Sequence, residues 1–216
     1  MIPVKICGIT RLEDANLAAW LGATWIGFVF WPPSPRHVPP ATAAGILAAL
    51  PPHVTGVGVF VDQPVEEVNA VAERVGLGVV QLHGAEPAET CAACRRRVIK
   101  AVRLSSDSSE RAIEAVWDEA TVLLDAFDPV RVGGSGRQVD WHLAAALARR
   151  RPTILSGGLH ADNVAEAIDR VSPYAIDVSS GVEAEPGVKD HDRLRAFFAA
   201  VRAASGGPEP ASKEMG

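Results

Sequence analysis

The chain contains little of what several protein classes require. It has three cysteines among 216 residues, and its 21 lysine and arginine residues are outnumbered by 26 aspartate and glutamate residues. Three cysteines do not make a disulfide framework. A net charge of -5 without a dense basic stripe argues against nucleic acid as the main partner. No apolar stretch approaches the roughly 20 residues of a membrane span, so we expect no membrane partner either.

The N-terminus also lacks the basic region and apolar run of a secretory leader. Together with the scarcity of cysteine, this predicts a cytoplasmic protein. Cys91 and Cys94 form a Cys-x-x-Cys pair, but no second pair and no histidine cluster at zinc spacing accompanies it. We therefore expect both cysteines to be small residues of an outer helix, and we expect no metal.

Short apolar runs alternate with segments of helical spacing along the whole chain. The runs are nearly continuous, which is typical of parallel strands buried on both faces. The expected strands are Lys5 to Cys7, Trp25 to Phe30, Val57 to Val61, Val79 to Leu82, Val98 to Val102, Val122 to Leu124, Thr153 to Leu155 and Ala175 to Val178. The expected helices are Leu12 to Leu21, Ala41 to Leu50, Val65 to Val75, Glu86 to Arg97, Ser109 to Trp117, Trp141 to Arg149, Asn163 to Val171 and Asp192 to Ala203.

Eight strand–helix units in a chain of about 200 to 250 residues predict an α/β fold, a single (β/α)8 TIM barrel. An open doubly wound sheet is the main alternative, but it usually has fewer strands and a Gly-x-Gly-x-x-Gly turn after the first. We expect residues 1–204 to form one catalytic barrel domain. Residues 205–216 are rich in Gly, Pro and Glu, and we expect a disordered tail there.

In a barrel, the carboxyl ends of the strands converge on the face where catalysis takes place. Cys7 ends the first strand, and Thr10 with Glu13 reads as a capping box that opens the next helix. Asp125 leaves the sixth strand. Each has a plainer interpretation, because free cysteine is often a small core residue and Asp125 could shape a turn. If both face the mouth, they form a pair of proton-transfer groups, which suits an isomerase without a cofactor.

Other polar residues fall at the same face. Arg36, in the loop after the second strand, could anchor a carboxylate through its guanidinium fork, or be a solvated loop charge. Gln81 and His83 end the fourth strand, and Asp177 ends the eighth. We predict substrate-binding positions at all four of these residues.

Two glycine-containing loops follow the seventh and eighth strands, where barrels commonly bind phosphate through backbone N–H groups. Glycine allows the backbone to approach an anion closely. We predict a phosphate site at Gly157, Gly158, Ser180 and Gly181, although tight turns alone would also explain such loops. A further loop, Gly133 to Gly136, lacks the Lys-Ser/Thr ending of a P-loop and is interpreted as a lid.

The motifs occur together in one known family. The sequence resembles phosphoribosylanthranilate isomerase of tryptophan biosynthesis along nearly its whole length. The motifs that carry the resemblance are Lys5-Ile6-Cys7-Gly8-Ile9-Thr10, Gly27-Phe28-Val29-Phe30, Pro35-Arg36, Gly58-Val59-Phe60-Val61, Gln81-Leu82-His83-Gly84, Leu123-Leu124-Asp125, Gly133-Gly134-Ser135-Gly136, Leu155-Ser156-Gly157-Gly158-Leu159, Asp177-Val178-Ser179-Ser180-Gly181-Val182-Glu183, Pro186-Gly187 and Lys189-Asp190.

The resemblance implies an Amadori rearrangement of N-(5-phosphoribosyl)anthranilate to 1-(2-carboxyphenylamino)-1-deoxyribulose 5-phosphate. It implies that Asp125 is the general acid, that Cys7 is the base acting as thiolate, and that Arg36 holds the anthranilate carboxylate. Gly157, Gly158, Ser180 and Gly181 look like the phosphate cradle. The partner is then a small phosphosugar-anthranilate substrate, no cofactor is expected, and the protein is a monomer or a homodimer.

Two alternatives remain at this point. The chain could be another phosphosugar aldose-ketose isomerase barrel or a dual-substrate relative, but those carry an Asp at the end of the first strand, where this chain has Cys7. It could also be a silent phosphosugar-binding module. The presence of both Cys7 and Asp125 argues against that reading, since binding needs neither an acid nor a base.

Overall fold

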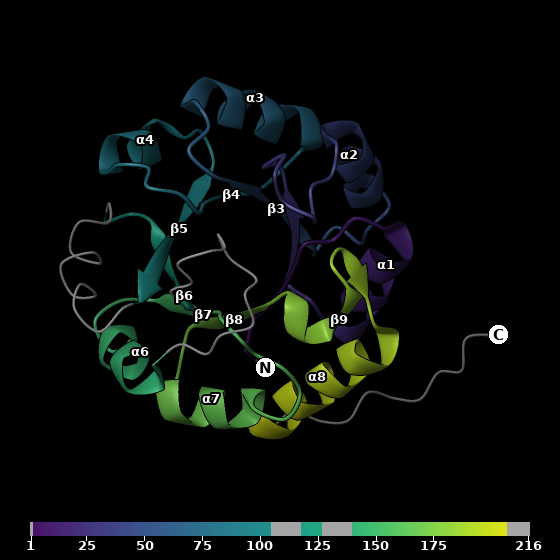
Figure 1. Ribbon diagram of the computed structural model, residues 1–216, viewed down its shortest axis with the longest axis vertical. Helices are drawn as coiled ribbons and strands as arrows, with labels where there is room; N and C mark the ends of the chain where they lie inside the picture. Colours follow the sequence, from purple (N-terminus) through teal and green to yellow (C-terminus); the bar gives the residue numbers. More distant parts are fainter. Residues whose placement is uncertain (1, 105–117, 127–139, 207–216) are drawn as a thin grey trace.

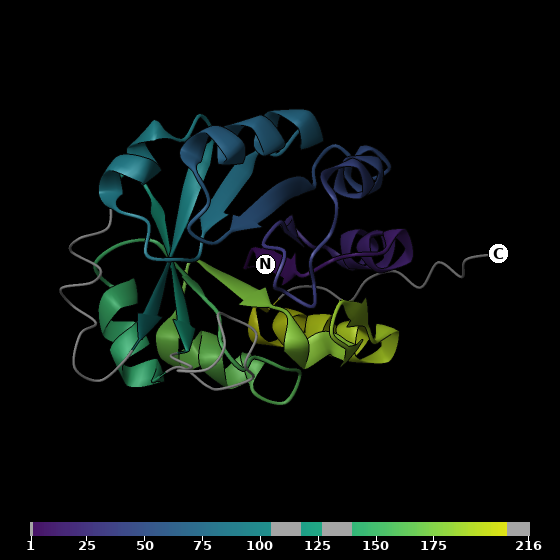
Figure 2. The same ribbon diagram turned by 45° about the horizontal axis from the view of Figure 1, so that its top comes forward.

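The computed structural model describes residues 2–104, 118–126 and 140–206. Eight strands pair in parallel in their sequence order and close into a barrel. Figure 1 looks along the barrel and shows the helices as an outer ring around the strands, and Figure 2 shows the same arrangement tilted. The predicted (β/α)8 TIM barrel is confirmed.

The strands lie close to the apolar runs that predicted them. The barrel strands are β1 (Val4–Cys7), β2 (Trp25–Val29), β3 (Thr55–Phe60), β4 (Val79–Leu82), β5 (Arg97–Leu104), β6 (Thr121–Ala126), β7 (Thr153–Leu155) and β8 (Ala175–Val178). The helices are α1 (Leu12–Leu21), α2 (Pro40–Ala48), α3 (Val65–Val75), α4 (Ala88–Ala93), α6 (Trp141–Ala148), α7 (Val164–Val171) and α8 (His191–Ala204). The helix expected at Ser109 to Trp117 and the loop at Gly133 to Gly136 lie outside the described residues.

The core has an outer and an inner layer, because strand side chains alternate in direction. On β1, Val4 and Ile6 are fully buried in the large apolar cluster that includes residues of the helices. Burial of an Ile side chain contributes about 1.5–3 kcal/mol. Lys5 and Cys7 have the opposite parity and lie on the inner side of the strand. A separate apolar cluster contains Val57, Ile99 and Leu123 from the barrel strands and fills the interior.

Two local predictions are wrong. The capping box at Thr10 and Glu13 does not form: α1 begins after Arg11 without a side-chain cap, and the Thr10 hydroxyl donates to the Gly187 carbonyl oxygen. The helix expected from Glu86 to Arg97 is only six residues long. Glu86 leaves it because its buried carboxylate accepts from Lys100 Nζ at 2.7 Å, and Arg97 already belongs to β5.

The segment after β8 contains elements that we did not expect. Ser180–Val182 forms a short 3-10 helix, and β9 (Glu183–Glu185) pairs with β10 (Val188–Lys189) as an antiparallel hairpin. Pro186 and Gly187 connect the two strands, and Gly187 has a positive φ of 85°. Such a Pro-Gly turn is the signal that could have predicted the hairpin.

The predicted C-terminal boundary of the domain lies close to the end of the described residues. The last helix, α8, ends at Ala204, and residues 207–216 lie outside the described residues, so the division at 204 stays a prediction. None of the helices in the described part of the chain has the length and apolar character needed to cross a membrane.

Candidate active site

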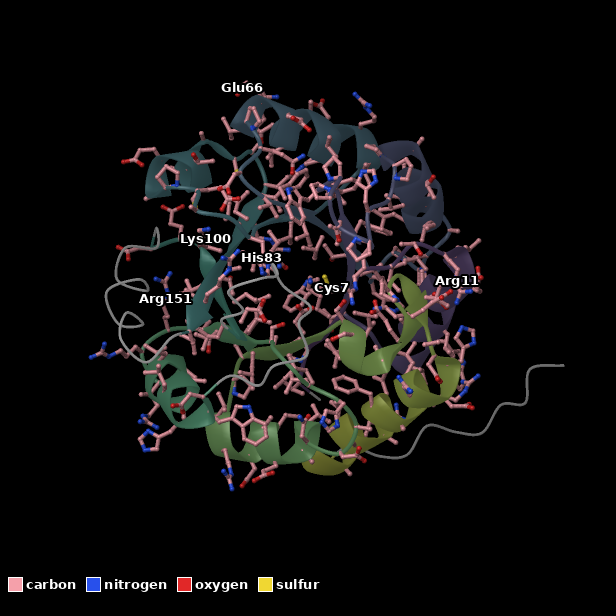
Figure 3. The ribbon with its side chains drawn as sticks, in the orientation of Figure 1. Cys7, Arg11, Glu66, His83, Lys100 and Arg151 are labelled. Atoms are coloured by element: carbon pink, nitrogen blue, oxygen red, sulfur yellow. The ribbon has the colours of Figure 1, made fainter. Side chains whose placement is uncertain are left out.

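One pocket opens at the carboxyl ends of the strands. It encloses about 720 Å³, part of which is open to solvent. Figure 3 shows Cys7 and His83 near the centre of the ring, whereas Arg11 and Glu66 lie at its outer edge. All ten predicted site residues line this pocket, namely Cys7, Arg36, Gln81, His83, Asp125, Gly157, Gly158, Asp177, Ser180 and Gly181. The structure therefore brings all ten residues together.

Cys7 stands at the end of β1 and is 8% exposed. It packs with Val29, Val59 and Trp31, which form a small apolar cluster on its side of the pocket. Burial raises the pKa of the Cys7 thiol, because a charged sulfur loses its hydration there. The charge of Lys5 is the main group that opposes this rise. Cys7 is thus a buried thiol that faces both apolar and cationic neighbours.

Asp125 leaves β6 into the same pocket and is hydrogen-bonded in a chain of three side chains. Gln81 Nε2 lies 2.8 Å from His83 Nδ1, and the tautomer with hydrogen on His83 Nε2 fits this contact. His83 Nε2 lies 3.1 Å from Asp125 Oδ2 and donates to it. This contact fixes the position of Asp125 Oδ2.

Arg36 reaches the pocket from the loop after β2 and is held by Glu183 on β9. Its Nε and Nη2 donate to the Glu183 carboxylate at 2.9 and 2.6 Å, the bidentate geometry of a strong pair. Lys189 Nζ donates to Glu183 Oε1, the oxygen that also accepts from Arg36 Nε, at 2.8 Å. Burial alone would raise the pKa of Glu183, but Arg36 and Lys189 hold it below its ordinary value. Among the described residues, the Nη1 edge of Arg36 has no hydrogen-bond partner.

Asp177 is oriented by two donors. Lys5 Nζ, fully buried in the barrel, donates to Oδ1 at 2.9 Å, and the Ser156 hydroxyl donates to Oδ2 at 3.2 Å. Lys5 and Asp177 are also register partners on neighbouring strands. Asp177 therefore lines the pocket as half of a buried ion pair.

The two loops after β7 and β8 lie against each other. Gly157 and Gly158 both adopt positive φ, at 82° and 66°, which a side chain would disfavour. A Cβ on Gly181 would overlap the Leu159 carbonyl oxygen, so only glycine allows the two loops to pack this closely. The result is a concave stretch of backbone without side chains at these positions, which suits an anion bound through N–H groups.

Sequence reasoning missed three charged residues of this region. Lys5, Glu183 and Lys189 are at most 5% exposed, and each is ion-paired. The sequence could have indicated a role for Lys5. A lysine is rarely fully buried unless it is paired, so a lysine inside an apolar strand predicts a nearby opposite charge. For Glu183 and Lys189 the signal was weak, because their burial depends on the hairpin.

Within residues 2–104, 118–126 and 140–206, no group of three or more His, Cys, Asp or Glu side chains could hold a metal ion. Cys91 is buried in α4 and Cys94 follows as its C-cap. Burial raises the pKa of Cys94 to about 11, which disfavours the thiolate that metal or redox chemistry needs. These two cysteines are placed as predicted, on an outer helix and its end.

A family model and a similar protein of known name both point to the same family. The family model described as N-(5'phosphoribosyl)anthranilate (PRA) isomerase matches residues 4–200. The N-(5'-phosphoribosyl)anthranilate isomerase of Geobacter metallireducens is 51% identical over 203 residues, which cover 94% of this chain and all of that protein.

Solved structures of similar proteins share the fold. A phosphoribosyl anthranilate isomerase in complex with reduced 1-(o-carboxyphenylamino)-1-deoxyribulose 5-phosphate is 46% identical, with a TM-score of 0.84 over 95% of this chain and all of that one. A monomeric form of the dimeric enzyme from Thermotoga maritima is 44% identical, with a TM-score of 0.82 and the same coverage.

Proposed function

Because the chain belongs to the N-(5'-phosphoribosyl)anthranilate isomerase family, we propose that it catalyses the Amadori rearrangement of N-(5-phosphoribosyl)anthranilate to 1-(2-carboxyphenylamino)-1-deoxyribulose 5-phosphate. The observation that carries the proposal is that Cys7 and Asp125, from strands that are not neighbours, line one pocket together with Arg36 and the glycine loops. An acid, a base, a carboxylate anchor and an anion cradle are the groups that this substrate needs.

The reaction begins at Asp125. Its protonated carboxyl group gives a proton to the ribose ring oxygen, the C1–O bond breaks, and the anthranilate nitrogen forms a Schiff base with C1. His83 donates to Asp125 Oδ2 and so orients the carboxyl group. An acid placed within hydrogen-bond reach in this way typically contributes about 10²–10⁴-fold to a rate.

Cys7 acts in the second step. As thiolate it removes the proton from C2 of the sugar, and the electron pair of the C–H bond moves to the Schiff base to give an enolamine. The enolamine then tautomerises to the ketone, so the sequence is a net isomerisation without a redox partner. The small apolar cluster around Cys7 keeps water away from the carbon acid.

The other groups bind the substrate. Arg36 is held at its Nε edge by Glu183, which presents the Nη1 edge to the anthranilate carboxylate. The backbone at Gly157, Gly158, Ser180 and Gly181 holds the phosphate, and Gln81 and Asp177 line the sugar between the two anionic ends. A monomer or a homodimer, and a cytoplasmic location, stay predictions.

Chemical trapping of the product tests the proposed reaction. We expect borodeuteride treatment of a completed reaction to yield a carboxyphenylamino pentitol phosphate that carries deuterium at C2, where the product has its ketone, as located by mass spectrometry and NMR. A control reaction without protein should give none of it. Recovery of a compound with deuterium at C1 only, or of free anthranilate, would mean that the chain does not form the C2 ketone.

Removal of Arg36 should mainly weaken substrate binding. We expect Arg36→Ala to raise KM by roughly 10- to 100-fold, because a charge-assisted hydrogen bond contributes about 1.5–3 kcal/mol, while kcat changes much less. Steady-state kinetics measures both values. Arg170→Ala is the matched control, since that arginine pairs with Glu166 on the outer face of α7. An unchanged KM in the Arg36 variant would show that another group holds the carboxylate.

A further inference from the structure

A buried lysine lies beside the proposed base. Lys5 is fully buried, two residues before Cys7 on β1, and both side chains are on the inner side of the strand. A buried charge is costly and is retained only where another charge faces it. Asp177 is one such charge, at 2.9 Å from Lys5 Nζ. Cys7 is the second candidate.

Gly27 brings the two groups close. It is the register partner of Cys7 on β2. A Cβ at this position would stand 3.1 Å from Cys7 Sγ and also 3.1 Å from Lys5 Nζ. The two atoms are therefore at most twice that distance apart, and the missing side chain of Gly27 leaves the space between them open. An opposite charge at such a range stabilises a thiolate.

Among the described residues, the ion pairs nearest Cys7 contain more cations than carboxylates. Three cations of this region are buried or partly buried, Lys5, Lys189 and Arg36, and they share two carboxylates, Asp177 and Glu183. Lys189 Nζ also donates to the Cys7 carbonyl oxygen at 2.6 Å. The ionisable groups that line the pocket farther from β1, His83 and Asp125, are hydrogen-bonded to each other. A negative sulfur would be a third anion beside these three cations.

We propose that Lys5 stabilises the Cys7 thiolate and that Asp177 sets how strongly it does so. This role of Lys5 adds to the proposed function. It depends on that function in one respect only, namely that the thiolate acts as the base. Lys5 acts through Cys7 and is a positioning residue. Burial raises the pKa of Cys7, Lys5 lowers it and Asp177 raises it again, so the two partners of one ion pair have opposite effects on the sulfur.

The opposite signs provide the test. Lys5→Met and Asp177→Asn break the same ion pair, so a purely structural role predicts similar changes for both. The proposal predicts that the pH midpoint for alkylation of Cys7 by iodoacetamide moves up by about one unit or more in Lys5→Met and moves down in Asp177→Asn. The rate is followed by mass spectrometry of the peptide containing Cys7, so Cys91 and Cys94 do not contribute. Thermal unfolding of each variant reports its structural cost.

The double variant Lys5→Met/Asp177→Asn keeps the experiment decisive if Lys5→Met does not fold. It carries no buried charge at either position, and its midpoint should lie above that of the unaltered protein. Equal midpoints in all folded variants, or shifts of one sign in both single variants, would overturn the proposal. Alkylation needs no substrate, so this result is independent of whether the isomerase reaction is observed.

Discussion

Replacement of Cys7 by serine is expected to lower kcat by about 10²–10⁴-fold, the range that a general base contributes. A hydroxyl is far less acidic than a thiol, and neither Lys5 nor Lys189 brings it within reach of ionisation near neutral pH. Serine is close to cysteine in size, so the apolar cluster of Val29, Val59 and Trp31 stays packed. Steady-state kinetics should therefore show a collapse of kcat with a KM close to that of the unaltered protein.

Cys94→Ser is the control for this substitution. Cys94 lies at the end of α4, outside the pocket, and its sulfur contacts the Thr90 carbonyl oxygen. We expect full activity in this variant. If Cys7→Ser retained the activity of the control, the thiol would have no part in proton removal, and the base would have to be sought elsewhere in the pocket.

Replacement of Asp125 by asparagine should reduce kcat over a similar range, since an amide cannot give a proton to the ring oxygen. The side chain is nearly isosteric, and its oxygen can still accept from His83 Nε2. The fold and the substrate affinity should therefore survive, and a binding measurement with the reduced product should show it. Only the proton transfer is removed.

Asp169→Asn, on the exposed face of α7, is the matched change outside the pocket and should leave kcat unaltered. A primary isotope effect separates the roles of the two site residues. With ring opening impaired in Asp125→Asn, deuterium at C2 of the substrate should slow the reaction less than in the unaltered protein. An undiminished isotope effect together with normal kcat would remove Asp125 from the mechanism.

The barrel could be predicted from the sequence because its strands are buried on both faces. Runs such as Val122 to Leu124 are continuous and apolar, and this pattern belongs to parallel sheets. The barrel hypothesis then placed Cys7 and Asp125 at one mouth, since both follow apolar strands directly. Positions set by one strand and the loop that follows it can be inferred from the sequence, because they depend on residues that are close together in the chain.

Features that depend on distant contacts were not predictable. Thr10 had the sequence of a capping residue, yet its hydroxyl bonds to Gly187, 177 positions away. Glu86 had a helical context, yet Lys100 draws it out of α4 into a buried ion pair. Tertiary partners override local propensity in both places.

The charged groups around Cys7 could not be predicted from the sequence for the same reason. Lys5 is adjacent in sequence, but Asp177 and Lys189 approach only because β8 and the hairpin close the ring beside β1. The sequence predicts a thiol at the mouth of the barrel. Only the folded structure shows the charged groups that can stabilise its thiolate form.

The most direct measurement follows the fluorescence of N-(5-phosphoribosyl)anthranilate, made in situ from anthranilate, as purified protein is added. The account predicts a rapid decay with the unaltered chain and with Cys94→Ser, and a decay slower by about two orders of magnitude or more with Cys7→Ser and Asp125→Asn. A constant fluorescence in the presence of the unaltered chain would contradict the account.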